Sequence, residues 1–232
     1  MQQARDTHAP PASVRRRQGE RRATTRARLI EAALDVFALA GYEHAGVDDI
    51  AAAAGVSKGA FYFHFTTKQD ILLELLRIWS VSRTSRLTSA CRAAGSHADR
   101  LRETLGVLLT YGDFRWPRLL IEFWGEAARS DDVARALRRT HRRWLTIVGH
   151  AIAEAAGGTW AGAVDDAAAA VLAVHDGLVC EAALGRTLGA REVEQRVAPL
   201  LASLIAAGVS SDGAWWHEGP KSSVPAHLRA GA

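Results

Sequence analysis

Residues 47–65 read VDDIAAAAGVSKGAFYFHF, and this stretch predicts two short helices joined by a tight turn. We expect the first helix over Val47–Ala54. Gly55 follows it, and glycine is the residue that most easily adopts the left-handed conformation at a helix end. Ser57 then suits the N-cap of a second helix over Lys58–His64, because its hydroxyl accepts from the free N–H groups of the next turn. This is the layout of a helix-turn-helix, whose second helix enters the major groove of DNA.

The inner side of this motif is apolar. Small residues at Ala51 and Ala54 allow the two helices to approach closely. The side chains expected to form the core beneath them are Ile50, Val56, Phe61 and Phe65. Gly46 stands at the N-cap of the first helix, and Asp49 at its third helical position is favoured by the helix dipole. The motif therefore carries its own core and its own capping residues.

The same stretch resembles the signature of the tetracycline-repressor (TetR) family of regulators. The shared positions are Ile50-Ala51, Ala54-Gly55-Val56-Ser57, Gly59, Tyr62, His64-Phe65, Lys68 and Leu72. The chain departs from the pattern at Ala45-Gly46, where members usually carry Thr or Ser and often make a hydroxyl contact to phosphate. The resemblance covers residues 24–76 and implies an all-α fold. The implied architecture is an N-terminal three-helix helix-turn-helix DNA-binding domain followed by a helical-bundle ligand-binding and dimerisation domain.

The resemblance also implies which side chains of the motif meet DNA. These residues are Lys58, Gly59, Ala60, Tyr62, His64 and Lys68. Among them, Lys58 combines the position and the donors needed to read a base edge, and guanine suits it best. Tyr62 and Lys68 are expected to meet phosphate. For His64, packing within the motif is an equally good interpretation.

A basic segment precedes the motif. Between Val14 and Arg28 there are seven arginines against the single acid Glu20. Those expected to touch DNA phosphates or the minor groove are Arg21, Arg22 and Arg26. The alternative is a solvated, disordered N-terminus, and the two are compatible because such arms often order on binding.

Composition and helical periodicity divide the chain into four parts. They are a flexible basic arm at 1–23, the helix-turn-helix domain at 24–67, the helical ligand-binding and dimerisation domain at 68–208 and an irregular tail at 209–232. The first domain helix is expected to begin near Thr24 or Thr25 and to end at Gly41. A long helix from Lys68 to about Ala94 would be shared by both domains, so it can carry movement between them.

Further helices are expected over His97–Tyr111, Trp116–Ala128, Asp131–Ala156, 164–184 and 190–207. Five arginines at 135, 138, 139, 142 and 143 are expected on a broad solvated face. The last two helices are unusually apolar, and the resemblance implies that they pair with their copies in a homodimer. A dimer also suits DNA reading, because two helices related by a two-fold axis read a palindromic operator.

The resemblance implies a small-molecule site in the second domain. Its expected lining is Trp79, Tyr111, Phe114, Glu122, Phe123, Trp124, Trp144 and His175. A carboxylate such as Glu122 among aromatic rings can hold a cation, and the stretch from Leu119 to Trp144 loosely resembles the choline-responsive repressor subgroup. The alternatives are that the aromatic residues are core, that Glu122 is exposed or paired, and that His175 forms a buried polar pair with Asp176.

Composition and motifs limit the remaining possibilities. With 232 residues, of which 48% are hydrophobic, the chain can form one small and one larger domain. The sequence carries no nucleophile–base pair, metal-ligand cluster or cofactor loop, so we expect no catalytic residue, metal or cofactor. It has no apolar run suited to a signal peptide or membrane span, so we expect a cytoplasmic protein without a membrane partner.

These observations favour a homodimeric transcriptional regulator, most simply a repressor that a small-molecule effector releases from its palindromic operator. A ligand-independent DNA-organising protein and an all-helical enzyme are the alternatives. Activation instead of repression is a variant, because the sign depends on where the operator lies.

Overall fold

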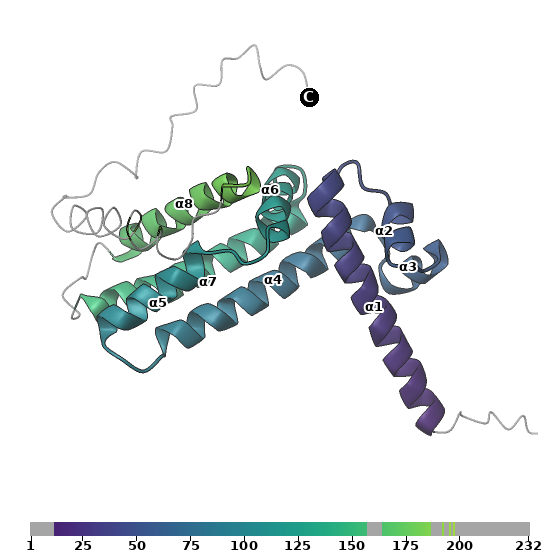
Figure 1. Cartoon of the computed structure of the whole chain (residues 1–232), viewed down its shortest axis with the longest axis horizontal. Coiled ribbons are helices and arrows are strands. Elements are labelled where there is room, and N and C mark those ends of the chain that lie inside the picture. The colour runs from purple at the N-terminus through teal and green to yellow at the C-terminus, as the bar shows by residue number, and fades with distance from the viewer. Residues whose placement is uncertain (1–11, 157–163, 187–191, 193–194, 196, 198–232) are drawn as a thin grey trace, which may run out of the picture.

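In the computed structural model, residues 12–156 and 164–186 are described, together with the single positions 192, 195 and 197. Within these ranges the secondary structure consists of eight α-helices (Figure 1). They are α1 (Ala12–Ala40), α2 (Val47–Ala53), α3 (Lys58–His64), α4 (Lys68–Cys91), α5 (His97–Leu109), α6 (Arg115–Ala127), α7 (Asp131–Ala155) and α8 (Val164–Ala183). The predicted all-α fold is confirmed.

The first three helices form the compact unit that the motif predicts. α1 packs on both α2 and α3. Leu29, Ala33 and Phe37 of α1 are buried, and their spacing of four residues places them on one helical face. Gly41 ends α1 with a φ of +81°, in the left-handed region that glycine tolerates. We call α1–α3 the reading head.

The start of α1 was expected near Thr24, and this expectation is wrong. The helix begins at Ala12, because its arginine-rich first half contains good helix formers and no proline. Arg16 and Glu20 form an i,i+4 ion pair at 3.7 Å. The Thr24 hydroxyl donates to the Glu20 carbonyl at 2.9 Å, so this threonine lies inside the helix instead of capping it. The described part of the expected flexible arm is therefore helical.

α4 belongs to both halves of the molecule. The Thr67 hydroxyl accepts from the Asp70 N–H at 3.1 Å, and the Asp70 carboxylate accepts from the Thr67 N–H at 2.9 Å. This reciprocal cap starts a helix of 24 residues, which is about 36 Å long. α4 packs on α1 in the reading head and on α5 and α7 in the bundle.

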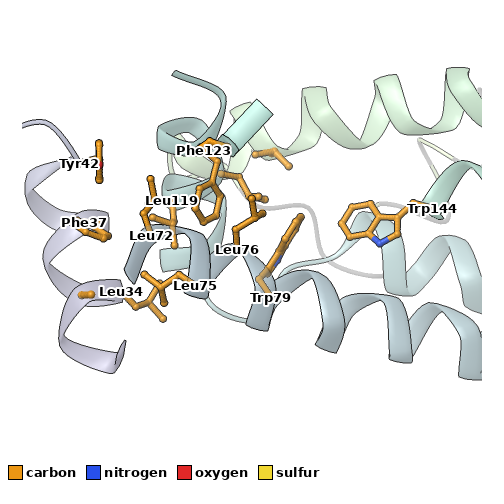
Figure 2. Close-up of a cluster of buried hydrophobic side chains, with 14 of the residues drawn as sticks. Leu34, Phe37, Tyr42, Leu72, Leu75, Leu76, Trp79, Leu119, Phe123 and Trp144 are labelled. Atoms are coloured by element: carbon orange, nitrogen blue, oxygen red, sulfur yellow. The ribbon is translucent and has the colours of Figure 1, made fainter. Parts of the chain in front are cut away.

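One apolar core joins the reading head to the bundle. Figure 2 shows Phe37 of α1 lying beside Leu72 and Leu75 of α4 and Leu119 and Phe123 of α6. All five side chains are at most 1% exposed. Because α4 and α6 share this core with α1, the core provides a direct contact between both helices and the reading head.

The helix ends lie close to their predicted positions. α4 ends at Cys91 instead of about Ala94, and α5 ends at Leu109 instead of Tyr111. Thr110 stops α5 early by adopting an extended backbone. Ser96 and Ser130 cap α5 and α7 with their hydroxyl oxygens.

The C-terminal predictions fall mostly on residues that the structure does not describe. The expected helix at 190–207 lies outside the described residues apart from three single positions, and the expected tail at 209–232 lies outside them entirely. In the part of the chain that is described, no helix has the length and apolarity needed to cross a membrane.

Candidate nucleic-acid interface and ligand cavities

The turn between α2 and α3 forms as the sequence predicts. The Gly46 N–H donates to the Asp49 carboxylate at 2.8 Å and caps α2. Gly55 has a φ of +61°, and the Val56 N–H returns to the Ala51 carbonyl at 3.0 Å. The Ser57 hydroxyl accepts from the Ala60 N–H at 3.2 Å and starts α3. These local bonds fix the angle at which α3 leaves the reading head.

α3 has one buried face and one exposed face. Phe61 and Phe65 are 0% and 5% exposed and fill the core beneath the helix, as expected. Tyr62 and Phe63 are 51% and 61% exposed and point to the outside. Phe63 was not among the predicted DNA-contacting residues. The sequence did contain a signal for its exposure. Phe63 lies midway between the core residues Phe61 and Phe65, and on a helix such a residue points to the opposite face.

The cation and the two small residues at the start of α3 are accessible. Lys58 is exposed, and its ammonium donates to the Asp48 carboxylate of α2 at 2.8 Å. This carboxylate raises the pKa of Lys58 through its hydrogen bond and its charge. A Cβ added to Gly59 would meet only the Ser57 hydroxyl, at 3.8 Å. Packing within the protein therefore does not require glycine at 59. The missing side chain does allow a DNA phosphate to approach the backbone closely at this position. Ala60 is half-buried.

The predicted arginines of α1 divide into two groups. Arg22 places its guanidinium 5.1 Å from the centre of the Phe63 ring, beside the exposed face of α3. Arg21 is exposed. Arg26 lies over the Phe65 ring at 5.0 Å and pairs with Glu74 of α4 at 2.9 Å, so it holds the reading head to α4.

Lys68 and His64 also serve the fold. The Lys68 ammonium donates to the carbonyls of Tyr42 and Glu43 at 2.7 and 3.2 Å and lies 4.3 Å from the centre of the Tyr42 ring. Lys68 therefore ties the start of α4 to the end of α1. His64 is half-buried against Phe63, and its burial, aided by two nearby arginines, lowers its pKa.

Two cavities open in the bundle, and Trp79 of α4 lines both. The first, which we call the tryptophan cavity, has a volume of about 310 Å³ and is also lined by Trp124, Trp144 and His175. The second, which we call the arginine cavity, has a volume of about 300 Å³ and is also lined by Arg83 and Tyr111. Five of the eight predicted ligand residues therefore line one of these cavities.

A buried polar chain connects the two cavities. His175 is 3% exposed, and its Nδ1 lies 2.9 Å from a carboxylate oxygen of Asp176. Its Nε2 is hydrogen-bonded to the Tyr111 hydroxyl. Burial lowers the pKa of His175, so the ring is neutral, with Nδ1–H donating to Asp176 and Nε2 accepting from Tyr111. His175 is thus fully satisfied within the fold.

Three predicted ligand residues lie outside both cavities. Phe123 is fully buried in the core that joins the two halves, and Phe114 is 56% exposed. The Glu122 carboxylate accepts from the Tyr42 N–H at 2.9 Å. It therefore caps a free backbone donor beyond the end of α1 instead of holding a cation among aromatic rings.

The five arginines of α7 form the expected exposed face. Three of them, Arg135, Arg139 and Arg143, also line a groove of about 600 Å³ between α4 and α7. Arg138 and Arg142 lie at the tryptophan cavity. Among the described residues, no group of three or more acidic, histidine or cysteine side chains is placed to hold a metal ion.

Comparison with known families matches both halves of this chain to related regulators. Residues 29–75 match the bacterial regulatory proteins of the tetR family. Residues 97–206 match the C-terminal domain of BetI-type transcriptional repressors. The chain belongs to the TetR family. The two matches fall on the reading head and on the bundle, in the order that the motif implied.

Curated relatives of this TetR-family chain match mainly its N-terminal part. The transcriptional activator FasR of Mycolicibacterium smegmatis is 34% identical over 99 residues, which are 42% of this chain and 45% of that protein. The regulator SrpR of Pseudomonas putida is 48% identical over 52 residues, covering 22% of this chain and 24% of that protein. The matched stretch spans less than half the length of these relatives.

Solved structures extend the likeness to the whole fold. A transcriptional regulator from Rhodococcus sp. Rha1 is 28% identical with a TM-score of 0.68, and the match covers 78% of this chain and 96% of that one. A regulator from Saccharomonospora viridis in complex with choline has the same TM-score at 22% identity, covering 76% of this chain and 95% of that one. At that identity the second likeness concerns the fold.

Ion pairs join the reading head of this TetR-family chain to α6. Arg115 at the start of α6 lies 2.5 Å from Glu31 and 2.8 Å from Asp35, both on α1. A second pair joins Arg129, after the end of α6, to Glu43 at 2.9 Å. Together with the Glu122 bond, these contacts hold α6 along its length against α1 and the residues that follow it. We call this set the α1–α6 joint.

Proposed function

We propose that this chain is a DNA-binding transcriptional regulator that acts as a homodimer on a palindromic operator and is not an enzyme. The observation that carries the proposal is the exposed face of α3, where Lys58, Tyr62 and Phe63 stand outward over a closed core. A positively charged group and two aromatic rings on an exposed recognition helix suit phosphate and base-edge contacts. Membership of the TetR family supports the same role.

The proposed contacts follow from which side chains are accessible. Lys58 is the base-reading candidate, and it would exchange Asp48 for a base edge on binding. Tyr62, Arg21 and Arg22 would meet phosphates, and Gly59 and Ala60 would allow close approach. The side chains of His64 and Lys68 are engaged within the fold. These two residues would therefore support DNA binding indirectly, by holding the backbone around α3 in position.

The domain boundaries are part of the proposal. We assign 24–67 to DNA binding and 68–208 to ligand binding and dimerisation, with α4 shared between them. The apolar composition of α8 and of the segment at 190–207 supports a dimer built from these two segments. Two copies related by a two-fold axis would present two recognition helices to half-sites about one DNA turn apart.

The regulator would leave its operator when a small molecule binds in the bundle. The two cavities, the family match to BetI-type repressors and the choline complex of a protein with this fold support a small-molecule effector. The α1–α6 joint and the shared α4 supply the route from cavity to reading head. An effector that prefers the non-binding arrangement by about 100-fold would contribute roughly 2.7 kcal/mol per site.

Selection of bound sequences from a random DNA pool tests the DNA-binding proposal. The wild-type protein should enrich a palindrome. Lys58→Ala should weaken binding by about 1–3 kcal/mol and relax the preference at one position of each half-site. Tyr62→Phe should weaken binding without changing the selected sequence, because it loses a phosphate contact.

Arg102→Ala is the matched control, since Arg102 is an exposed cation on α5, outside the reading head. It should select the same palindrome as the wild-type protein. Enrichment of no sequence, with only salt-sensitive general binding, would contradict the proposal and favour a DNA-organising protein.

A further inference from the structure

Arg83 is a buried cation, and among the described residues no carboxylate forms an ion pair with it. It lies on α4 and is 6% exposed. One terminal nitrogen donates to the Leu108 carbonyl at 2.5 Å, and the guanidinium lies 4.4 Å from the centre of the Tyr111 ring. Its Nε is buried and has no hydrogen-bond partner among the described residues. Buried charges in proteins are normally paired, because an unpaired one is costly to remove from water.

Within the part of the chain that the structure describes, no carboxylate is left free to neutralise Arg83. Burial lowers the pKa of Arg83, the neighbouring Tyr111 raises it, and the second cation Arg86 lowers it. Asp113 lines the same cavity, but its carboxylate accepts hydrogen bonds from the Arg115 guanidinium at 2.7 and 3.1 Å. These bonds hold the pKa of Asp113 below its usual value, so its charge is committed to Arg115.

The arginine cavity lies directly beside this unpaired cation. Its volume of about 300 Å³ is at the small end of the range for small-molecule sites. Trp79, Tyr111 and Trp116 supply flat apolar surfaces, and Ser82 adds a hydroxyl. Arg86 lines the cavity and is exposed, so it adds positive charge on the solvent side. The lining therefore combines aromatic rings with an uncompensated positive charge.

We infer that the arginine cavity binds a small organic carboxylate with a flat apolar body, and that Arg83 holds its carboxylate. The guanidinium fork matches a carboxylate with two parallel hydrogen bonds. Because Nε is covered, rotation about the aliphatic side-chain bonds of Arg83 presents the guanidinium fork to the cavity when the anion enters. The aromatic walls then pack against the flat body. The inference rests on the proposed function only where it treats this carboxylate as the effector.

Binding at Arg83 would reach both the tryptophan cavity and the reading head. The Tyr111 ring packs under the guanidinium, and its hydroxyl bonds His175 in the tryptophan cavity. Asp113 and Arg115 lie shortly after Tyr111 in the chain. Arg115 is the residue of the α1–α6 joint that pairs with Glu31 and Asp35. A ligand that shifts the segment between α5 and α6 therefore acts on this joint within a few residues.

Thermal unfolding of the full chain with matched probes tests the inference. Benzoate and phenylacetate are the carboxylates, benzamide is the neutral counterpart of benzoate, and choline is the cation. At about 100 times its Kd, a bound carboxylate should raise the Tm by roughly 5–10 °C. Benzamide and choline at the same concentrations should leave the Tm unchanged.

Substitutions at two arginines of one cavity make the test specific. Arg83→Met should weaken carboxylate binding at least about 30-fold in calorimetric titration, because it removes the buried partner of the anion. The ligand-free Tm of Arg83→Met should equal or exceed that of the wild-type protein, because the unpaired charge is gone. Arg86→Met, at an exposed position of the same cavity, should retain most of the binding.

Several outcomes would overturn the inference. They are the absence of a Tm shift with both carboxylates, an equal shift with benzamide, and a shift that survives in Arg83→Met. If Arg83→Met fails to fold, the benzoate and benzamide comparison in the wild-type protein decides by itself. A shift with phenyl phosphate but with neither carboxylate would replace the carboxylate by a phosphate ester and so contradict the proposed class.

Failure of this inference is distinguishable from failure of the proposed function. Carboxylate binding is measured without DNA, and operator release is measured separately. Carboxylate binding through Arg83 that leaves operator affinity unchanged would contradict effector release and keep the binding site. Operator release by choline, with no carboxylate bound, would keep the regulator and reject the site.

Discussion

The candidate functional side chains of the reading head are exposed on its surface, whereas those of the bundle are buried in its interior. In the reading head, Lys58, Tyr62 and Phe63 stand on the outer surface, and the core beneath α3 is closed. In the bundle, Arg83 and His175 are buried beside cavities. An outward surface suits a large partner such as DNA, whereas inward groups suit a ligand that becomes enclosed. The α1–α6 joint is where the two arrangements meet.

Removing the closed core of the reading head should have the largest effect. Phe61→Ala deletes a fully buried ring and should cost about 3–5 kcal/mol, with complete loss of operator binding. All seven tryptophans lie at or beyond residue 79, so tryptophan fluorescence follows the second domain. In urea, the transition followed by circular dichroism should move further than the transition followed by fluorescence.

Phe63→Ala is the matched control, because it removes the same ring from the outer face of α3. Its stability should change by less than about 0.5 kcal/mol, while operator affinity falls. If both transitions of Phe61→Ala moved equally, the two regions would unfold as one unit and would not be separable in this way.

Cutting the joint should have an intermediate effect. Arg115→Ala removes the ion pairs to Glu31 and Asp35, and it also removes the pair to Asp113 of the arginine cavity. Operator affinity without effector should change little, but the effect of ligand on that affinity should fall by about 1–3 kcal/mol. The measurement is operator binding with and without the carboxylate that stabilises the wild-type protein.

Arg118→Ala is the control for the joint. Arg118 is exposed on the same helix and lies over Phe114. The ligand effect should be unaltered in this variant. An unaltered ligand effect in Arg115→Ala as well would show that the Arg115 ion pairs do not carry the coupling.

Changing the bare outer surface of α3 should have the smallest effect. Gly59→Ala adds a methyl group that meets only the Ser57 hydroxyl, at 3.8 Å, so stability should stay constant or rise by up to about 1 kcal/mol. Operator affinity should fall by up to about tenfold, because the methyl group keeps DNA away. Fluorescence anisotropy and thermal unfolding measure the two quantities.

Gly106→Ala is matched to this change, because Gly106 lies in α5 with open space around the added Cβ. It should reproduce the stability change and leave operator affinity intact. An equal loss of affinity in both variants would argue against a DNA contact at residue 59.

The turn and the helix caps of the reading head could be predicted almost residue by residue, because their geometry depends on neighbours in sequence. Gly55 and Ser57 act through the backbone groups next to them, and the caps at Gly46 and Thr67 reach three residues. Rules for helix ends and turns apply at that range. The start of α1 was missed because Thr24 satisfies both a capping pattern and an interior bond to Glu20.

The bundle was predicted in its helices but only partly in its site. Glu122 stands among aromatic residues in the sequence, but its partner Tyr42 is 80 residues away. Arg83 lies in a polar stretch of α4, and its burial results from packing against Leu108 and Tyr111 in other elements. Such contacts depend on how helices pack, which local patterns do not determine.

The N-terminal turns of α1 extend past α2 and α3 (Figure 1). This rod is already ordered, so docking it on a polyanion avoids the backbone entropy of about 1–2 kcal/mol per residue that a coil would lose. In a two-fold assembly, two such rods would lengthen the nuclease footprint beyond the bases that the recognition helices read. The protected operator would then be longer than its conserved palindrome, and its flanks would contribute affinity that depends on salt and not on base identity.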